Sequence, residues 1–255
     1  MIMSRELVEL HGILLKILPY SENDNLLQLL TAEKGKVIIY AKKSSKTNRS
    51  GSYNQLFAYS KFELISRGHG MMVYSGSQMI ESFPELRQMP YAMAAGEYLC
   101  EVSTFVPENI DNPKEYLSLL LNSLYLLTDR KVKNLDYKTV KLVFEIAFLQ
   151  LSGLMPNAGE CSSCGNEPVY WNFDEGFLCG HCADKFPNSS LHLLDKSMFS
   201  AINHIMTVQG VKRYVFTMDH SSFNLLSWLS EEYMKYILET DLKTLNVYRQ
   251  LVTRE

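Results

Sequence analysis

The sequence lacks the local signatures of the common enzyme classes. Its 255 residues contain no GxxxxGK[ST] phosphate loop, no HExxH pair, no GxSxG turn and no GxGxxG opening a helix. Histidine is scarce and scattered, and no histidine pairs in sequence with a carboxylate in a recognisable catalytic pattern. A nuclease would need a carboxylate cluster for metal ions, and the first eighty residues show no persuasive one. We therefore expect a protein that is not an enzyme.

Long hydrophobic runs are also missing. No apolar run approaches the roughly 18–20 residues that a membrane helix needs. The first residues, MIMSRELVELHG, carry acidic side chains where a signal peptide would have an apolar core. We expect a cytoplasmic protein, in which paired cysteines are more often metal ligands or redox groups than disulfides.

An excess of positive charge is absent overall but present locally. The formal net charge is −3, yet residues 1–80 carry ten Lys and Arg against six Asp and Glu. Between Lys34 and Lys61 there are seven basic residues and no acidic one. Because binding responds to local potential, this stretch is a candidate for phosphate contacts. The best candidates are Lys36, Lys42, Lys43, Lys46 and Arg49. A solvated loop beside core aromatic residues is the competing interpretation.

Residues 1–81 have the pattern of β-strands, and residues 82–255 that of helices. Five short runs rich in Val, Ile, Leu, Tyr and Phe are separated by turn residues, and together they predict a small five-stranded barrel. The runs are LVELHGILLKIL, NLLQLLTA, KVIIYAKK, LFAYSKFELISR and MMVYSGSQMIE. The sequence thus predicts an α+β protein, with a barrel domain followed by an α-helical domain that contains a cysteine-rich insertion at 158–187.

Helical periodicity predicts several helices within residues 82–255. Leucines from Leu117 to Leu127 fall on one helical face, and a second apolar face runs from Val140 to Leu151. On this second helix Lys138, Lys141 and Glu145 are expected on a different face. Asp195 is expected to cap a helix. One long final helix is expected from about Ser221, with Glu231 and Lys235 pairing at i,i+4.

Four of the five cysteines form two CxxC pairs separated by fourteen residues. They are Cys161, Cys164, Cys179 and Cys182. Each CxxC places two thiolates on one tight turn, and two such turns at the ends of a short hairpin complete a tetrahedral zinc site. A closed four-thiolate site is structural, so we expect one structural Zn²⁺ per chain. A reversible dithiol is the alternative, and His181 is a possible substitute ligand. The fifth cysteine, Cys100, lies in an apolar helical stretch and is expected to be buried and inert.

The stretch GILLKILPYSENDNLLQLLTAEKGKVIIYAKKSSK resembles the opening of the RecO family of bacterial DNA repair proteins. The resemblance rests on Ser21-Glu22, on Thr31-Ala32-Glu33 with Gly35 and Val37, and on Ala41-Lys42 before a basic loop. The order of parts agrees over nearly the whole chain. Lys43 departs from the pattern, since many relatives carry glycine there.

The resemblance implies an OB-fold barrel and a recombination mediator. Such a protein binds single- and double-stranded DNA, anneals complementary strands and works with RecR. It helps RecA replace single-strand binding protein (SSB), whose C-terminal tail is a further partner, on gapped DNA near the nucleoid. The alternative from another class is a structural zinc-ribbon protein-interaction module with an incidental basic loop. A groove for an acidic tail would need a cation, and the helix face near Lys138 and Lys141 is one option.

Overall fold

A computed structural model describes residues 6–22, 24–42, 55–66, 71–108, 110–128 and 136–252. The chain forms two compact units: residues 1–130 together with 242–255, and residues 131–241. Each unit brings together the elements that carry one of the candidate sites.

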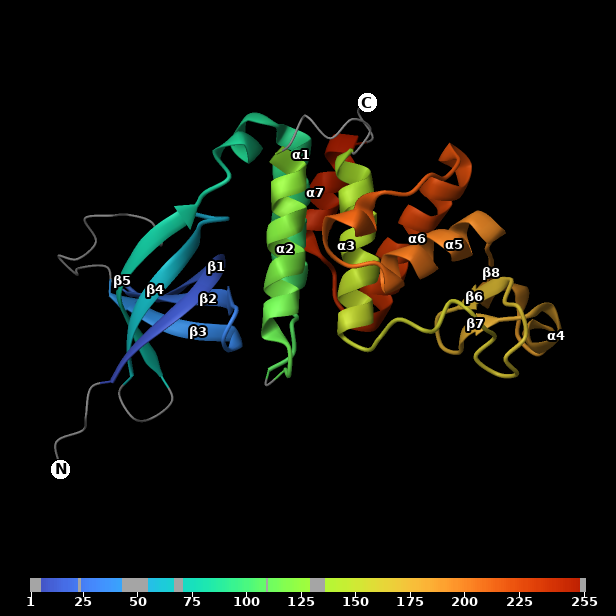
Figure 1. Ribbon diagram of the computed structural model, residues 1–255, viewed down its shortest axis with the longest axis horizontal. Helices are drawn as coiled ribbons and strands as arrows, with labels where there is room; N and C mark the ends of the chain where they lie inside the picture. Colours follow the sequence, from blue (N-terminus) through green and yellow to red (C-terminus); the bar gives the residue numbers. More distant parts are fainter. Residues whose placement is uncertain are drawn as a thin grey trace. The chain divides into compact units, whose positions relative to one another are not determined.

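A closed five-stranded barrel occupies the first part of the first unit (Figure 1), which confirms the expected architecture of a barrel followed by helices. The strand order around the barrel is β1-β2-β3-β5-β4. Its strands are β1 (Glu6–Ser21), β2 (Asp24–Thr31), β3 (Gly35–Lys42), β4 (Tyr59–Ser66) and β5 (Met72–Glu81). All pairs are antiparallel except β3 with β5, which close the barrel in parallel. Closure removes the exposed edges that an open sheet would have.

The barrel interior is filled by alternate residues of every strand. Because successive side chains of a strand point to opposite faces, the apolar positions at every second residue meet inside. The buried cluster comprises Leu10, Leu14, Leu27, Leu29, Ile39, Ala41, Phe62, Leu64 and Tyr74. A bulge between Leu14 and Lys16 shifts the alternation of β1, so that Ile17 packs inward and Lys16 lies outside.

Helices complete the first unit. They are the 3-10 helix η2 (Pro84–Gln88), α1 (Pro90–Ser103), α2 (Pro113–Thr128) and α7 (Lys243–Val252). Helix α1 packs against α2 and α7, and both α1 and α2 contact the barrel. The Glu101 carboxylate accepts hydrogen bonds from the backbone amides of Lys243 (3.3 Å) and Thr244 (2.9 Å). The first turn of α7 is thereby capped by a side chain from α1.

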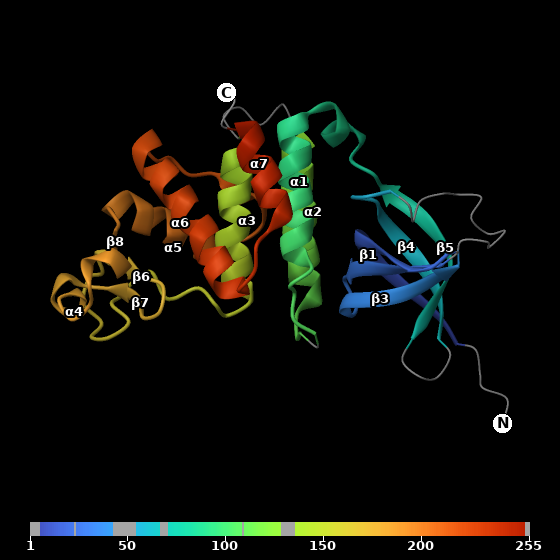
Figure 2. The same cartoon turned by 180° about the vertical axis from the view of Figure 1, so that it is seen from behind.

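The second unit contains helix α3 and the cysteine segment (Figure 2). Its helices are α3 (Tyr137–Leu151), α4 (Gly180–Ala183), α5 (Lys196–Thr207) and α6 (His220–Leu238), with 3-10 helices η3 (Asn188–Ser190) and η4 (Gly210–Tyr214). Strands β6 (Tyr170–Asn172), β7 (Gly176–Leu178) and β8 (His192–Leu193) form a small sheet in the order β7-β6-β8. Asp195 caps α5 as expected, since its carboxylate accepts from the Met198 amide at 2.9 Å. Across the described ranges, no helix has the length and apolar character required to span a bilayer.

The expectations for the helices are met in part. The long helix expected from about Ser221 is α6, which begins at His220, but it is not the final helix. It ends at Leu238 before Glu239, which adopts a left-handed conformation (φ 48°), and α7 follows. Lys141 and Glu145, expected on a different face from the apolar residues, are fully buried as those residues are. Glu231 pairs with Lys141 at 2.7 Å rather than with Lys235, which pairs with Glu232. Lys141 therefore cannot supply a surface cation for an acidic tail.

Candidate metal centre and nucleic-acid interface

The four cysteines of the two CxxC pairs come together in the second unit. Their Sγ atoms all lie within 4.8 Å of one another, and Cys164 and Cys179 are 3.6 Å apart. A tetrahedral Zn²⁺ with Zn–S bonds of about 2.3 Å separates its sulfurs by about 3.8 Å. The four thiols are therefore spaced to hold a metal ion.

The backbone builds this cluster from two turns and a hairpin. In the first turn the Gly165 amide donates to the Cys161 carbonyl, and the Ser162 amide donates to Phe177 of β7. The second pair spans the start of the short helix α4, where the Ala183 amide donates to the Cys179 carbonyl. Between β6 and β7, Gly176 has a φ of +88°, and a Cβ on it would lie 2.5 Å from Ser162 Oγ. Glycine is thus required where the hairpin closes on the first turn.

The thiols influence one another electrostatically. Burial raises the pKa of Cys161, but hydrogen bonds from the backbone amides of Cys179, Ser163 and Cys164 outweigh it and lower this pKa to about 6. Hydrogen bonding to Cys164, with burial, raises the pKa of Cys182 to about 12. A thiolate at Cys161 thus disfavours a second one at Cys182, an arrangement that a bound dication relieves.

The ligand set also indicates what the centre can do. Four thiolates fill a tetrahedral ion and leave no position for water or substrate, so the chemistry available is structural. His181 is exposed on α4 and lies outside the group of side chains that could hold an ion within the described ranges. Cys100 is buried in α1, far along the chain from the cluster, and burial raises its pKa.

The basic candidates of the barrel divide into two groups. Lys36 and Lys42 lie on β3, whereas Lys43, Lys46 and Arg49 fall outside the described residues. The Lys42 side chain is exposed at the end of β3. The Lys36 ammonium donates to the Thr104 carbonyl at the end of α1 (3.1 Å). A neutral carbonyl does not cancel the charge of Lys36, but it does hold the side chain against the helix.

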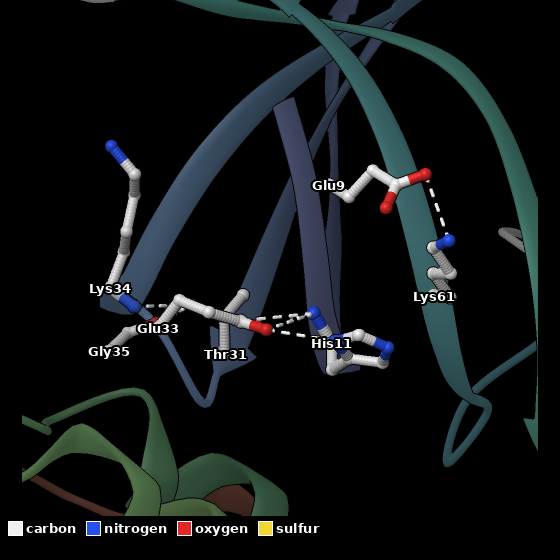
Figure 3. Close-up of polar contacts among 7 residues, drawn as sticks. All are labelled: Glu9, His11, Thr31, Glu33, Lys34, Gly35 and Lys61. Carbon is white, nitrogen blue, oxygen red and sulfur yellow. Dashed lines mark hydrogen bonds and ion pairs between the residues drawn. The ribbon is translucent and has the colours of Figure 1, made fainter. Parts of the chain in front are cut away.

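Thr31, Glu33 and Gly35, three of the residues that carry the family resemblance, have structural roles in the hairpin between β2 and β3 (Figure 3). Thr31 Oγ1 donates to the Gly35 carbonyl at 2.9 Å and accepts from the Lys34 amide at 3.2 Å. The Glu33 carboxylate accepts from the His11 backbone amide (3.0 and 3.1 Å) and contacts His11 Nδ1 at 2.8 Å. Gly35 adopts a φ of +67°. These residues fix the turn and attach it to β1, so their role is architectural.

Other charges at this end of the barrel are paired or point elsewhere. Lys61 on β4 forms an ion pair with Glu9 on β1 at 2.8 Å. The Lys34 side chain extends away from the contacts of the hairpin (Figure 3). Lys16 was not among the candidates, although it is exposed on β1. Its position on the outer face depends on the bulge after Leu14, which simple alternation of the sequence does not reveal.

Two family models match the chain and together cover most of it. The model described as "Recombination protein O N terminal" matches residues 3–83, and "Recombination protein O C terminal" matches residues 87–246. The first match coincides with the barrel, and the second covers nearly all of the helical part.

Curated relatives agree with these models. The chain is similar to the DNA repair protein RecO of Caldicellulosiruptor saccharolyticus, with 27% identity over 249 residues, 95% of this chain and 98% of the relative. It is similar to the DNA repair protein RecO of Bacillus pumilus, with 31% identity over 186 residues, 71% of this chain and 70% of the relative. A third RecO, from Symbiobacterium thermophilum, is 31% identical over 188 residues, 70% of this chain and 72% of the relative. With its barrel, its helices and its cysteine cluster in the matched regions, the chain belongs to the RecO family of DNA repair and recombination proteins.

Proposed function

We propose that the protein is a non-enzymatic recombination mediator that binds single- and double-stranded DNA and anneals complementary strands. In this proposal it acts with RecR and helps RecA replace SSB, engaged through its C-terminal tail, on gapped DNA at the nucleoid in the cytoplasm. Membership of the RecO family is the observation that carries the proposal. The barrel supports it, because OB-type barrels bind oligonucleotides on an open strand face and its loops.

The DNA contacts are proposed on the basic side of the barrel. Lys42 is exposed where β3 ends, and Lys43, Lys46 and Arg49 follow it in the sequence. Lys36 belongs to the same strand and carries its charge near the end of α1. Lysine and arginine that neutralise phosphates bind with little dependence on base sequence and strong dependence on salt. Annealing follows when this neutralisation lets two strands approach each other.

The cysteine cluster is proposed to hold one structural Zn²⁺ through Cys161, Cys164, Cys179 and Cys182. The closed geometry of the thiols supports this assignment. A bound ion would contribute folding free energy to the segment, in addition to the apolar contacts of Leu178, Tyr170 and Phe186 around the thiols. Metal analysis of the purified protein should find about one tightly held zinc per chain, and reversible thiol oxidation without zinc would refute the assignment.

A titration of DNA across salt concentrations tests the main proposal. The variant Lys42→Ala/Lys43→Ala/Lys46→Ala/Arg49→Ala should bind a labelled oligonucleotide more weakly, as measured by fluorescence anisotropy. If all four side chains contact phosphates, the slope of log affinity against log salt should fall by about 3 for single strands. Unchanged affinity at moderate salt would refute this location of the DNA contacts.

A matched control separates local contacts from general charge. The exposed lysines of other elements, Lys114, Lys185, Lys196 and Lys212, can be changed together to alanine, which removes the same charge. This control should keep most of the affinity. A wild-type protein that binds no DNA at low salt would favour the protein-interaction module instead. Annealing of SSB-coated complementary strands, with and without RecR, then tests the mediator role.

A further inference from the structure

The outer face of β1, β2 and β3 combines aromatic, aliphatic and basic side chains. Alternation along β3 turns Val37, Ile39 and Ala41 toward the interior, and so places the residues between them outside. The strand register aligns the outer residues in three rows: Lys42 with Asp24, Tyr40 with Leu26 and Leu18, and Ile38 with Gln28 and Lys16. The basic stretch between Lys34 and Lys61 does not reveal this face, because Lys16, Leu18 and Tyr20 come from an earlier part of the sequence.

Tyr20 is the most prominent aromatic side chain on this face. It is 61% exposed, and its ring meets the Tyr40 ring edge to face at 5.9 Å. The Tyr40 hydroxyl donates to Asp24 Oδ2 at 2.5 Å, and Ser21 Oγ donates to the same oxygen at 3.2 Å. Tyr40 is thus held in place by Asp24, and it supports Tyr20 from the side while leaving much of the Tyr20 ring accessible.

Two exposed lysines lie on this face together with the Asp24 carboxylate, and Glu22 is exposed in the adjoining turn. Lys16 and Lys42 are both exposed, while the carboxylate of Asp24 already accepts two hydrogen bonds from within the face. Ile38, which is 48% exposed, adds apolar surface in the row of Lys16, on the far side of Gln28. Exposed apolar surface usually marks an interaction site, and cations beside aromatic rings fit a ligand with anionic and aromatic parts. Single-stranded nucleic acid has both.

The end of α1 contacts one end of the face, and exposed side chains lie at the other. Lys36 and Gln28 both donate to the Thr104 carbonyl, at 3.1 and 3.5 Å, so the end of α1 lies over that side of β2 and β3. Tyr20 and Lys42 lie at the opposite ends of these strands. Both side chains are exposed, as a contact with nucleic acid requires.

We propose that the Tyr20 ring stacks on an unpaired base while Lys16 and Lys42 contact the neighbouring phosphates. This inference rests on the proposed function and deepens it, because it names single strands as the form of nucleic acid bound at this face. Bases in a duplex are already stacked on their neighbours and do not offer a free surface to Tyr20. A base held by stacking keeps its Watson–Crick edge open to an incoming complementary strand, which suits annealing.

The test compares Tyr20→Ala with Tyr125→Ala. Tyr125 is a matched control, since it is 58% exposed on α2 and lies outside the face. Each variant is titrated with a fluorescent oligo-dT and with a duplex of equal length at fixed salt. Tyr20→Ala should weaken binding of the single strand by about 5- to 100-fold, as expected for loss of one stacked base. Its duplex affinity should stay within about twofold, and Tyr20→Phe and Tyr20→Trp should retain single-strand affinity, since both keep a stacking ring.

A second measurement does not depend on a variant. An oligonucleotide with 5-iodouracil, irradiated in complex with the wild-type protein, should form a cross-link that peptide mapping locates at Tyr20. Lys16→Ala should weaken single-strand binding and reduce its salt dependence, because Lys16 contacts a phosphate of the bound strand.

The possible failures are distinguishable. If the wild type binds neither nucleic acid, the proposed function fails. If the wild type binds both, but Tyr20→Ala and Tyr125→Ala behave alike and no cross-link maps to Tyr20, only the stacking inference is overturned. If Tyr20→Ala keeps single-strand affinity but loses binding of RecR, the face docks a protein, and the inference is again overturned.

Discussion

The buried charges of the second unit provide a sharp test of its architecture. Lys141 on α3 is fully buried, and its ammonium lies 2.8 Å from Glu145 Oε1 and 2.7 Å from Glu231 Oε1. Ser230 on α6 donates to the other oxygen of Glu145 at 2.6 Å. At an effective dielectric constant of about 20, each ion pair contributes an attraction of about 6 kcal/mol. Desolvation of three ions, at several kcal/mol each, offsets most of that attraction.

Lys141→Met removes the ammonium that bridges Glu145 and Glu231 and keeps the length of the side chain. Two carboxylates then face each other in a buried place, and leaving a charge unpaired there costs about 3–5 kcal/mol in the free energy of unfolding. Glu145→Gln should cost far less, about 1 kcal/mol or less, because Lys141 keeps Glu231 and the amide can still contact Ser230. We therefore expect the two substitutions, although they affect the same cluster, to differ greatly in their cost in the free energy of unfolding.

Urea denaturation followed by tryptophan fluorescence measures both variants. The two tryptophans, Trp171 and Trp228, belong to the second unit, so the signal reports the unit that contains the cluster. If Lys141→Met and Glu145→Gln lower the free energy of unfolding equally, or if neither lowers it, the reasoning about the buried ion cluster is refuted.

The same cluster predicts a dependence on pH. Burial raises the pKa of Glu145 in the folded protein. Lys141 lowers this pKa and Glu231 raises it, and the net effect is an increase. When folding raises the pKa of a carboxyl group, the stability that this group contributes is fully present below its unfolded-state pKa. That stability is lost as the pH rises through the folded-state pKa. Without Lys141 this pKa rises further. The cost of Lys141→Met should therefore be larger at pH 8 than at pH 5, when stability is measured at both.

Three further substitutions address the remaining local structures. Cys161→Ser/Cys164→Ser should lower the zinc content of purified protein from about one per chain to almost none, as read by metal analysis, and reduce stability and solubility first. DNA binding should be lost only where the protein unfolds, so a folded double mutant that had lost annealing specifically would contradict a structural role. Gly35→Ala should cost about 1–3 kcal/mol in thermal or urea unfolding, because the turn needs a φ of +67° there. Asp136→Ala should cost about 1 kcal/mol in the same urea assay, since its carboxylate accepts from the Thr139 amide at 2.7 Å as the cap of α3.

The barrel could be predicted from the sequence because its strands are rich in Val, Ile, Leu, Tyr and Phe and are bounded by turn residues. The polar contacts between helices could not. Helical spacing suggested that Glu231 pairs with Lys235, yet Glu231 pairs with Lys141, ninety residues away along the chain. Pairing at i,i+4 is worth only a few tenths of a kcal/mol, so packing of α3 against α6 decides the outcome. The end of α6 was also hidden, because Glu239 adopts a left-handed conformation that usually belongs to glycine or asparagine.

The metal cluster was the easiest part of the sites to predict. Two CxxC pairs encode their own turns, and the hairpin between them needs only a glycine at 176 to close. The proposed DNA face was much less visible. It depends on the bulge after Leu14, which turns Lys16 outward, and on the register that brings Leu18 beside Leu26. Neither a bulge position nor a strand register can be read from residue types in a single strand.

Lys36 and Lys42 were grouped by charge, but their surroundings lead to different expectations. Lys36 donates to the Thr104 carbonyl at the C-terminal end of α1, where a cation also complements the helix dipole. Lys36→Met should therefore cost about 1–2 kcal/mol in the free energy of unfolding of the first unit. Lys42→Met, at the exposed end of the strand, should leave stability within about 0.5 kcal/mol and reduce DNA affinity. Thermal unfolding and anisotropy on the same preparations separate the two effects. If Lys36→Met costs no more stability than Lys42→Met, the Thr104 contact does not hold the barrel to α1.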